Sequence, residues 1–165
     1  MTSVLTFRDV LNKSLIEKLH EYSKSQKSCR TNYTSWHKDL VRASSAIMVF
    51  DLQDDLHQDV VKQAKNSCEE LHKYQKIYAV YHKMMPSSYI TWHQDNSWKF
   101  GMTINLNEYW EENFGGYFAY KNNQEIKCIK PEFNHANYIV TPLDHCVFST
   151  TPDAPPRTTI QIFGI

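Results

Sequence analysis

The sequence lacks an excess of charge of either sign, because its 165 residues include 18 lysines and arginines and 18 aspartates and glutamates. A balanced charge offers little affinity for phosphate backbones or anionic lipids, so we expect neither nucleic acid nor a membrane as a partner. Long hydrophobic runs are also missing, since stretches such as Ala46–Phe50 are far shorter than the ~20 residues that cross a bilayer.

Two further absences concern the cellular compartment. The N-terminal stretch 1–10 carries Arg8 and Asp9 in place of a long apolar segment, so a secretory signal peptide is not predicted. The four cysteines form no CxxC pair, which argues against a zinc knuckle or a dithiol redox motif. We therefore expect a cytoplasmic protein with free thiols.

The length of the chain favours one domain, 1–165, and we find no internal repeat or linker. The first part, about 1–75, is predicted to be helical with one strand. Apolar residues recur at helical spacing over 11–22 and again over 56–71, and 46–52 has the composition of a buried strand.

The second part, about 76–165, consists of short runs of β-branched and aromatic residues separated by turn residues. Over 100–106, and again over 157–162, apolar side chains alternate with polar or small ones, so each strand has one apolar and one polar face. We predict a mainly β fold with flanking helices (α+β). The predicted fold is a jelly roll whose sheets turn their polar faces inward, with two N-terminal helices packed on one sheet.

The tripeptide His-x-Asp occurs three times, at His37–Asp39, His57–Asp59 and His93–Asp95. Residues two apart point to the same side of a strand but not of a helix, so only an extended segment lets both bind one ion. The first copy lies in a polar, irregular stretch and the second in a helical pattern, whereas strand-like residues 89–92 lead into the third. We therefore expect the third copy to supply two metal ligands.

His145 is predicted to be the third ligand, because it begins the extended run 145–149 and precedes Arg157; His135, in a loop-like segment, is the rival. The remaining histidines are interpreted as surface or packed residues: His20, His72 and His82. Two histidines and one carboxylate are the ligand set of non-haem Fe(II) oxygenases, which leaves coordination positions open. A guanidinium can hold a carboxylate through two parallel hydrogen bonds.

These residues resemble the prolyl-hydroxylase-like branch of the Fe(II)- and 2-oxoglutarate-dependent dioxygenases. The resemblance covers about 76–165 and rests on His93-Gln94-Asp95, 103–110, Gly115-Gly116, 131–140, His145-Cys146-Val147 and Arg157-Thr158-Thr159-Ile160. It implies a double-stranded β-helix (jelly roll, cupin-like). It also implies that His93, Asp95 and His145 are the catalytic iron ligands and that Arg157 binds the distal carboxylate of 2-oxoglutarate.

Three further residues are expected in the co-substrate pocket. Thr159 lies on the same face of its strand as Arg157 and offers a hydroxyl. Tyr81 matches a family tyrosine that lines the pocket, although it is equally well read as an aromatic of the core. Asn105 stands where many prolyl hydroxylases have a co-substrate tyrosine, which is a departure from the family pattern. The presence of Asp95 favours hydroxylation, since halogenating relatives have a small residue there.

The resemblance implies a hydroxylase of a prolyl residue in a peptide or protein, which consumes dioxygen and decarboxylates 2-oxoglutarate to succinate, with ascorbate as a candidate reductant. A free amino acid or another small metabolite is the alternative substrate. A nucleic-acid demethylase is disfavoured because that branch has a second arginine where this chain has Phe163. A non-catalytic, cupin-like metal-binding module is the alternative from a different class.

Aromatic residues near the predicted metal strand suit either a groove for a peptide or proline ring or a sheet core: Trp92, Trp98, Tyr109 and Trp110. Tyr33 and Trp36 lie in a polar stretch that is a candidate lid over the cavity.

Overall fold

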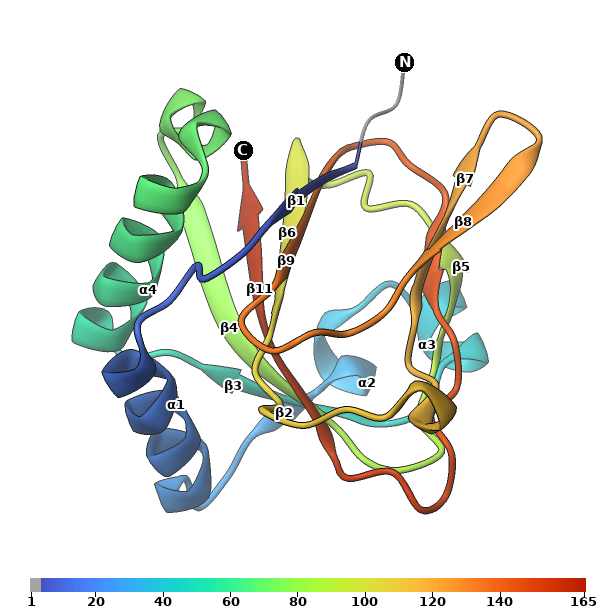
Figure 1. Ribbon diagram of the computed structural model, residues 1–165, viewed down its shortest axis with the longest axis horizontal. Coiled ribbons are helices and arrows are strands. Elements are labelled where there is room, and N and C mark those ends of the chain that lie inside the picture. Colours follow the sequence, from blue (N-terminus) through green and yellow to red (C-terminus); the bar gives the residue numbers. More distant parts are fainter. Residues whose placement is uncertain (1–3) are drawn as a thin grey trace.

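The computed structural model describes residues 4–165, apart from the side chains of Ser35, Arg42 and Ala43. Two antiparallel sheets face each other, and helices cover the outer face of the larger sheet (Figure 1). The predicted jelly roll with helices on one sheet is therefore confirmed. Residues 1–3, which belong to the predicted single domain 1–165, lie outside the described residues.

The larger sheet has seven strands. In sheet order they are β1 (Leu5–Phe7), β9 (Ala136–Val140), β6 (Phe100–Asn105), β11 (Arg157–Gly164), β4 (Ile77–Met84), β3 (Ile47–Asp51) and β2 (Arg30–Thr31). The smaller sheet has four strands, in the order β5 (Ile90–His93), β10 (His145–Val147), β7 (Phe118–Asn122) and β8 (Glu125–Ile129). The β7–β8 hairpin extends beyond the body of the molecule (Figure 1).

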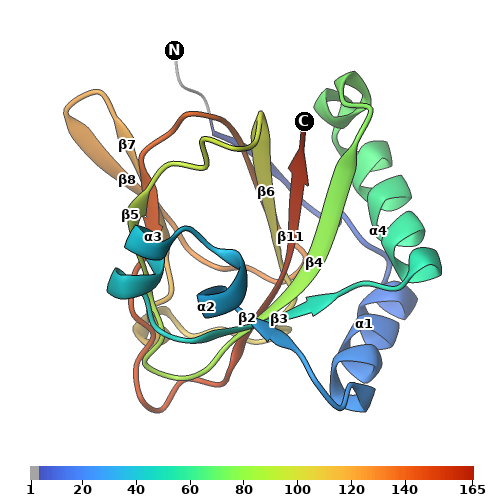
Figure 2. The ribbon, with the colours of Figure 1, turned by 180° about the vertical axis from the view of Figure 1, so that it is seen from behind.

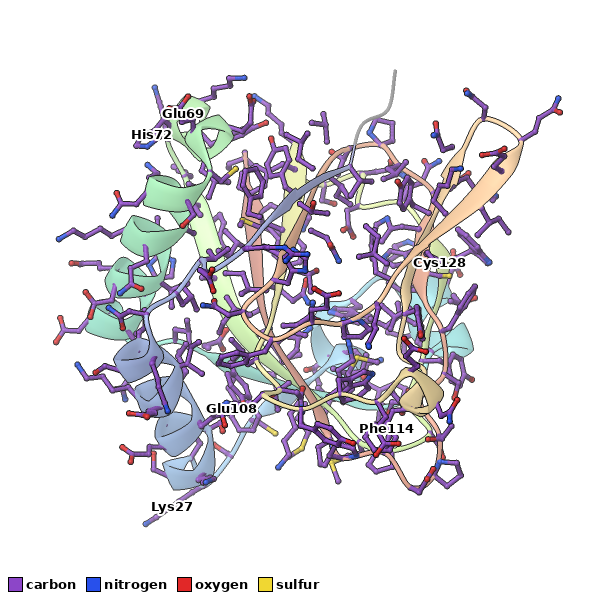
Figure 3. The ribbon with its side chains drawn as sticks, viewed as in Figure 1. Lys27, Glu69, His72, Glu108, Phe114 and Cys128 are labelled. Atoms are coloured by element: carbon purple, nitrogen blue, oxygen red, sulfur yellow. The ribbon has the colours of Figure 1, made fainter. Side chains whose placement is uncertain are left out.

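The helical layer consists of α1 (Lys13–Ser25) and α4 (Asp54–Ser67), with the 3-10 helix Glu69–Lys73 after α4. Asn12 caps α1 by accepting a hydrogen bond from the backbone N–H of Leu15, and Asp54 and Asp55 begin α4, where carboxylates interact favourably with the helix dipole. Figure 3 shows Glu69 and His72 at the end of this layer and Cys128 of β8 on the opposite side of the molecule.

The main hydrophobic core lies between the helices and the larger sheet. It combines Leu15, Ile16 and Leu19 of α1 with strand residues that point outward from the barrel, such as Phe100 and Ile160. The alternating polar residues of the same strands point to the other sheet, because successive side chains of a strand lie on opposite faces. The core and the barrel interior are thus two separate layers.

The first part of the chain contains two short strands and two short helices in addition to the predicted two helices and one strand. β1 and β2 have three and two residues, too few for an alternating pattern to be detected. Helices α2 (Asn32–Ser35) and α3 (Lys38–Ala43) occupy the polar stretch, and α3 lies beside β5 (Figure 2). Within residues 4–165, no helix combines the length and apolar character needed to cross a membrane.

Candidate active site

Three predicted ligands meet at one end of the barrel. His93 is the last residue of β5, Asp95 follows it, and His145 is the first residue of β10. His145 and His93 are directly paired across the two antiparallel strands, so their side chains point to the same side of the smaller sheet. The ring centroids of the two histidines are 4.2 Å apart.

The carboxylate of Asp95 lies between the two imidazoles. Its Oδ1 is 3.7 Å from Nε2 of His93, and its Oδ2 is 3.5 Å from Nε2 of His145. One ligand atom from each of the three residues lies within 4.8 Å of the others. This is the spacing of donors around a single ion, and the mixed imidazole and carboxylate set suits Fe(II).

Both histidines have their other ring nitrogen occupied in the same way. Nδ1 of His93 donates to the carbonyl of Thr91, and Nδ1 of His145 donates to the carbonyl of Leu143, each at 2.8 Å. Because a carbonyl only accepts, Nδ1 carries the hydrogen and the lone pair of each Nε2 points toward Asp95. Burial, then the neighbouring His93, lower the pKa of His145, which favours its neutral, metal-binding form.

A hydrogen-bonded clamp joins the two strand ends that carry the ligands. Gln94, between His93 and Asp95, donates through Nε2 to Oδ1 of Asp144 at 2.9 Å, and Asp144 directly precedes His145. Lys121 of β7 approaches the second oxygen of Asp144 at 3.3 Å. This clamp was not predicted from the sequence, where its signal is two polar residues, Gln94 and Asp144, each adjacent to a predicted ligand.

Strand register arranges the inner face of the larger sheet into four rows. We name the rows from the end of the barrel that is farthest from the three predicted metal ligands. They are a deep row (Ile47, Met84, Arg157), a middle row (Arg30, Val49, His82, Thr159, Asn105), a third row (Asp51, Val80, Gln161, Thr103, Asn137) and a mouth row (Tyr78, Phe163, Gly101, Ile139). Adjacent rows are two residues, or about 7 Å, apart along a strand.

Gly101 of the mouth row lies next to the predicted metal ligands. A Cβ built on Gly101 would lie 3.6 Å from Oδ2 of Asp95 and 3.4 Å from Cγ1 of Ile139. The mouth row therefore faces the ligand end of the smaller sheet, and the hydrogen atom of glycine leaves space beside the carboxylate.

Arg157 is deeply buried, with 2% of its surface exposed. Its Nη2 donates to Oδ1 of Asn105 at 2.9 Å, so the guanidinium extends from the deep row to the middle row. Its Nη1 has a 3.5 Å contact to the sulfur of Met84, and its Nε has no hydrogen-bond partner among the described residues. Burial lowers the pKa of Arg157 to about 10. No described carboxylate forms an ion pair with it.

Thr159 and Asn105 lie in the middle row beside Arg157, whereas Tyr81 does not. Oγ1 of Thr159 accepts from Nε2 of Gln161 at 3.0 Å. Tyr81 points into the helix-side core, where its hydroxyl lies 3.0 Å from Nδ1 of His20, so the expectation that Tyr81 lines the pocket is wrong. Its neighbour His82 has the inward position, since a shift of one residue changes the face of a strand.

The other His-x-Asp copies lie away from this site. His37 caps α3 on the surface beside Asp39, and His57 lies on α4. His135, the rival third ligand, lies 3.1 Å from Glu132. Among the described residues, the group that could hold a metal consists of His93, Asp95 and His145.

Of the four aromatic residues considered for a groove, Trp98 lies at the mouth. It stacks on Phe163 at 5.3 Å and also contacts Tyr78. Trp92 lies under Lys121, and Trp110 is buried with its Nε1 bonded to the carbonyl of Gly115.

The proposed lid residues lie elsewhere. Trp36 packs with Ile47, Met84 and Val147 at the deep end of the barrel, away from the metal ligands. Tyr33 is exposed.

Comparison with solved structures shows the same fold in prolyl hydroxylases. A Pseudomonas putida prolyl-4-hydroxylase matches with a TM-score of 0.72 and 9% identity over 99% of this chain and 93% of that chain. A Trichoplax adhaerens prolyl hydroxylase, in complex with a peptide fragment of the hypoxia inducible factor oxygen degradation domain, matches with a TM-score of 0.71 and 14% identity over 98% and 83%.

A viral collagen prolyl hydroxylase from Paramecium Bursaria Chlorella virus-1, in a 2-oxoglutarate complex, matches with a TM-score of 0.66 and 12% identity over 98% of this chain and 96% of that chain. No protein-family model and no curated protein matches the sequence. The fold of this chain is therefore the double-stranded β-helix found in these prolyl hydroxylases.

Proposed function

We propose that the chain is an Fe(II)- and 2-oxoglutarate-dependent oxygenase formed by a single domain. The observation that supports this most is the combination of a two-histidine, one-carboxylate cluster with a buried arginine that lacks an anionic partner among the described residues. A buried charge without a counter-ion is costly, so its retention is best explained by a ligand that brings the missing negative charge. The distal carboxylate of 2-oxoglutarate is such a group.

The two features lie at opposite ends of one inner wall. The guanidinium of Arg157 reaches the middle row through Asn105, and Asp95 lies against Gly101 of the mouth row. The third row lies between them, so a short dicarboxylate bound here would lie against Thr103 and Gln161, with its keto acid end toward the metal ligands and its far carboxylate toward Arg157. A guanidinium presents several N–H donors in one plane, which orients the carboxylate as well as attracting it.

The proposed reaction converts 2-oxoglutarate, dioxygen and a C–H bond into succinate, carbon dioxide and a C–OH group. His93, Asp95 and His145 would hold Fe(II), which supplies the activation of dioxygen when bound. The chain's own residues orient the keto acid through Arg157 and exclude water by enclosing it between the two sheets. Ascorbate as a reductant stays a prediction, as does the cytoplasmic location.

A prolyl residue in a peptide or protein is our proposed substrate. Tyr78, Trp98 and Phe163 form a half-exposed aromatic wall beside Gly101, where a pyrrolidine ring could pack. A surface cleft of about 410 Å³, lined by Lys99, Thr141 and others, shares Trp98 with this wall, and we propose it as the place for flanking residues. The structurally similar Trichoplax protein in complex with a peptide supports this class over a free amino acid or another small metabolite.

Anaerobic titration of the purified protein with Fe(II) and 2-oxoglutarate tests the proposal. We expect a visible charge-transfer band that requires both components, disappears in Asp95→Ala and needs more 2-oxoglutarate in Arg157→Ala. His135→Ala is the matched control and should behave as the wild type. Bound metal without a band would contradict the proposal and favour the cupin-like module. If the band forms, proline peptides are then screened by mass spectrometry for the gain of one oxygen atom.

A further inference from the structure

His82 is a buried titratable residue on the inner face of the barrel, with 4% of its surface exposed. It lies in the middle row, paired directly with Thr159 and one row from Arg157, which is paired with Met84. Its inward direction follows from its neighbours, because Ala79 and Tyr81 belong to the helix-side core whereas Met84 contacts the guanidinium of Arg157. The imidazole therefore shares a wall with the residues that we propose to hold the distal carboxylate.

Among the described residues, packing and charge rather than hydrogen bonds connect His82 to its neighbours. Trp36 contacts the ring at a centroid distance of 5.9 Å and 42°, which is a packing contact. Arg157 and Arg30 are the charged groups that act on it. Among the side chains that the structure describes, none forms a hydrogen bond or an ion pair with His82. Buried polar groups are normally hydrogen-bonded, so this imidazole lacks the expected partner.

The side chain of Asn105 is largely occupied by hydrogen bonds within the protein. The position that resembles the family's co-substrate tyrosine holds an asparagine here, and its carbonyl oxygen already accepts from Arg157. The amide nitrogen of Asn105 donates to the backbone carbonyl of His135 at 3.2 Å. The Asn105 oxygen and one of its two amide N–H groups are thus engaged, so Asn105 offers at most one N–H to a carboxylate beside Arg157.

We propose that His82 donates a ring N–H to the distal carboxylate of 2-oxoglutarate, beside Arg157. This proposal rests on the proposed function of the site. A carboxylate accepts from both a guanidinium and an imidazole N–H, and two donors from adjacent strands fix its orientation better than one. Burial and the two arginines lower the pKa of His82 to about 3, so near pH 7 the ring is neutral and carries one N–H.

The test compares two keto acids that share the metal-binding end. 2-Oxoglutarate has the distal carboxylate and 2-oxobutyrate lacks it, and the affinity of each is measured from the anaerobic charge-transfer band. In His82→Leu we expect the affinity for 2-oxoglutarate to fall roughly 10- to 100-fold, the usual effect of losing one hydrogen bond to a charged group. The affinity for 2-oxobutyrate should stay unchanged, because that ligand does not reach His82.

Two further variants complete the design. His82→Gln keeps an N–H donor in a side chain of similar reach and should recover part of the affinity for 2-oxoglutarate. His72→Leu makes the same substitution at an exposed histidine, labelled in Figure 3, and should match the wild type. Thermal unfolding of each variant verifies that the compared proteins are folded.

The possible failures differ in their meaning. An unchanged affinity of His82→Leu for 2-oxoglutarate, or an equal loss for both keto acids, would overturn the assignment of His82 while leaving the oxygenase proposal intact. Absence of the band in the wild-type protein with metal bound would overturn both proposals.

Discussion

His82 should make the stability of the metal-free protein depend on pH. Burial, then Arg157 and Arg30, lower its pKa from 6.5 to about 3, so between these values the unfolded chain binds a proton that the folded protein does not. The free energy of unfolding is therefore highest above pH 6.5 and decreases as the pH falls toward 3. We expect the free energy of unfolding to fall by up to about 1.4 kcal/mol per pH unit from this residue.

Urea denaturation at several pH values between 6.5 and 4.5 measures this effect as a difference between proteins. His82→Leu should show a shallower dependence on pH than the wild type, and His72→Leu should not. At pH 7 we also expect His82→Leu to be at least as stable as the wild type, because leucine removes an unpartnered buried polar group. Parallel pH profiles of wild type and His82→Leu would show that the imidazole titrates normally.

The residue scale is also where prediction from sequence reached its limit. His93, Asp95 and Arg157 were selected because a ligand pair needs an extended segment and a guanidinium suits a carboxylate, and the structure brings them to one barrel. Tyr81 was expected in the pocket and His82 at the surface or packed, whereas Tyr81 lies in the core and His82, one residue later, has the inward position. Periodicity identifies a strand with two faces, but at His82 both faces are buried, so the pattern does not say which is inner.

At the element scale, the clamp between β5 and β10 should govern metal affinity more than stability. Gln94 and Asp144 connect the segment that carries His93 and Asp95 to the residue before His145. Partly exposed pairs of this kind contribute about 1 kcal/mol or less to folding. Residues that orient ligands commonly change metal affinity by roughly 10- to 100-fold. For Gln94→Ala we expect a loss near the lower end, since Asp144 keeps Lys121.

Titration with Co(II), followed by visible absorption, measures this loss. Lys127→Ala is the control, because it breaks a surface ion pair with Glu125 in the β7–β8 hairpin without touching β5 or β10. Equal metal affinities of Gln94→Ala and the wild type would show that the strand pairing alone sets the ligand geometry.

The long helices and strands could be predicted from the sequence, and the shortest strands could not. α1 and α4 have 13 and 14 residues, and β4 and β11 have eight each, enough for a periodic pattern to stand out. β1 and β2 extend the sheet at its edges through backbone pairing to β9 and β3, which places little demand on side chains. Such strands are set by tertiary contacts, so a local pattern cannot show them.

At the scale of the whole molecule, stability and the proposed chemistry reside in different layers. The main core lies between the helices and the larger sheet, and the polar rows lie on the other face of that sheet. Leu19, with no exposed surface, is central to the helix-side core. Removing its side chain beyond Cβ leaves a cavity there and should not move the metal ligands, which belong to the opposite sheet.

Leu19→Ala should therefore lower the free energy of unfolding by about 2–5 kcal/mol, the usual cost of this truncation in a packed core. Leu5→Ala makes the same change at a site that is 38% exposed on edge strand β1 and should cost about 1 kcal/mol or less. Under conditions where both variants stay folded, we expect their Co(II) affinities to equal that of the wild type. If Leu19→Ala weakened Co(II) binding as much as Gln94→Ala, the two layers would be mechanically coupled through the larger sheet, and the helices would have to be counted among the elements that position the metal ligands.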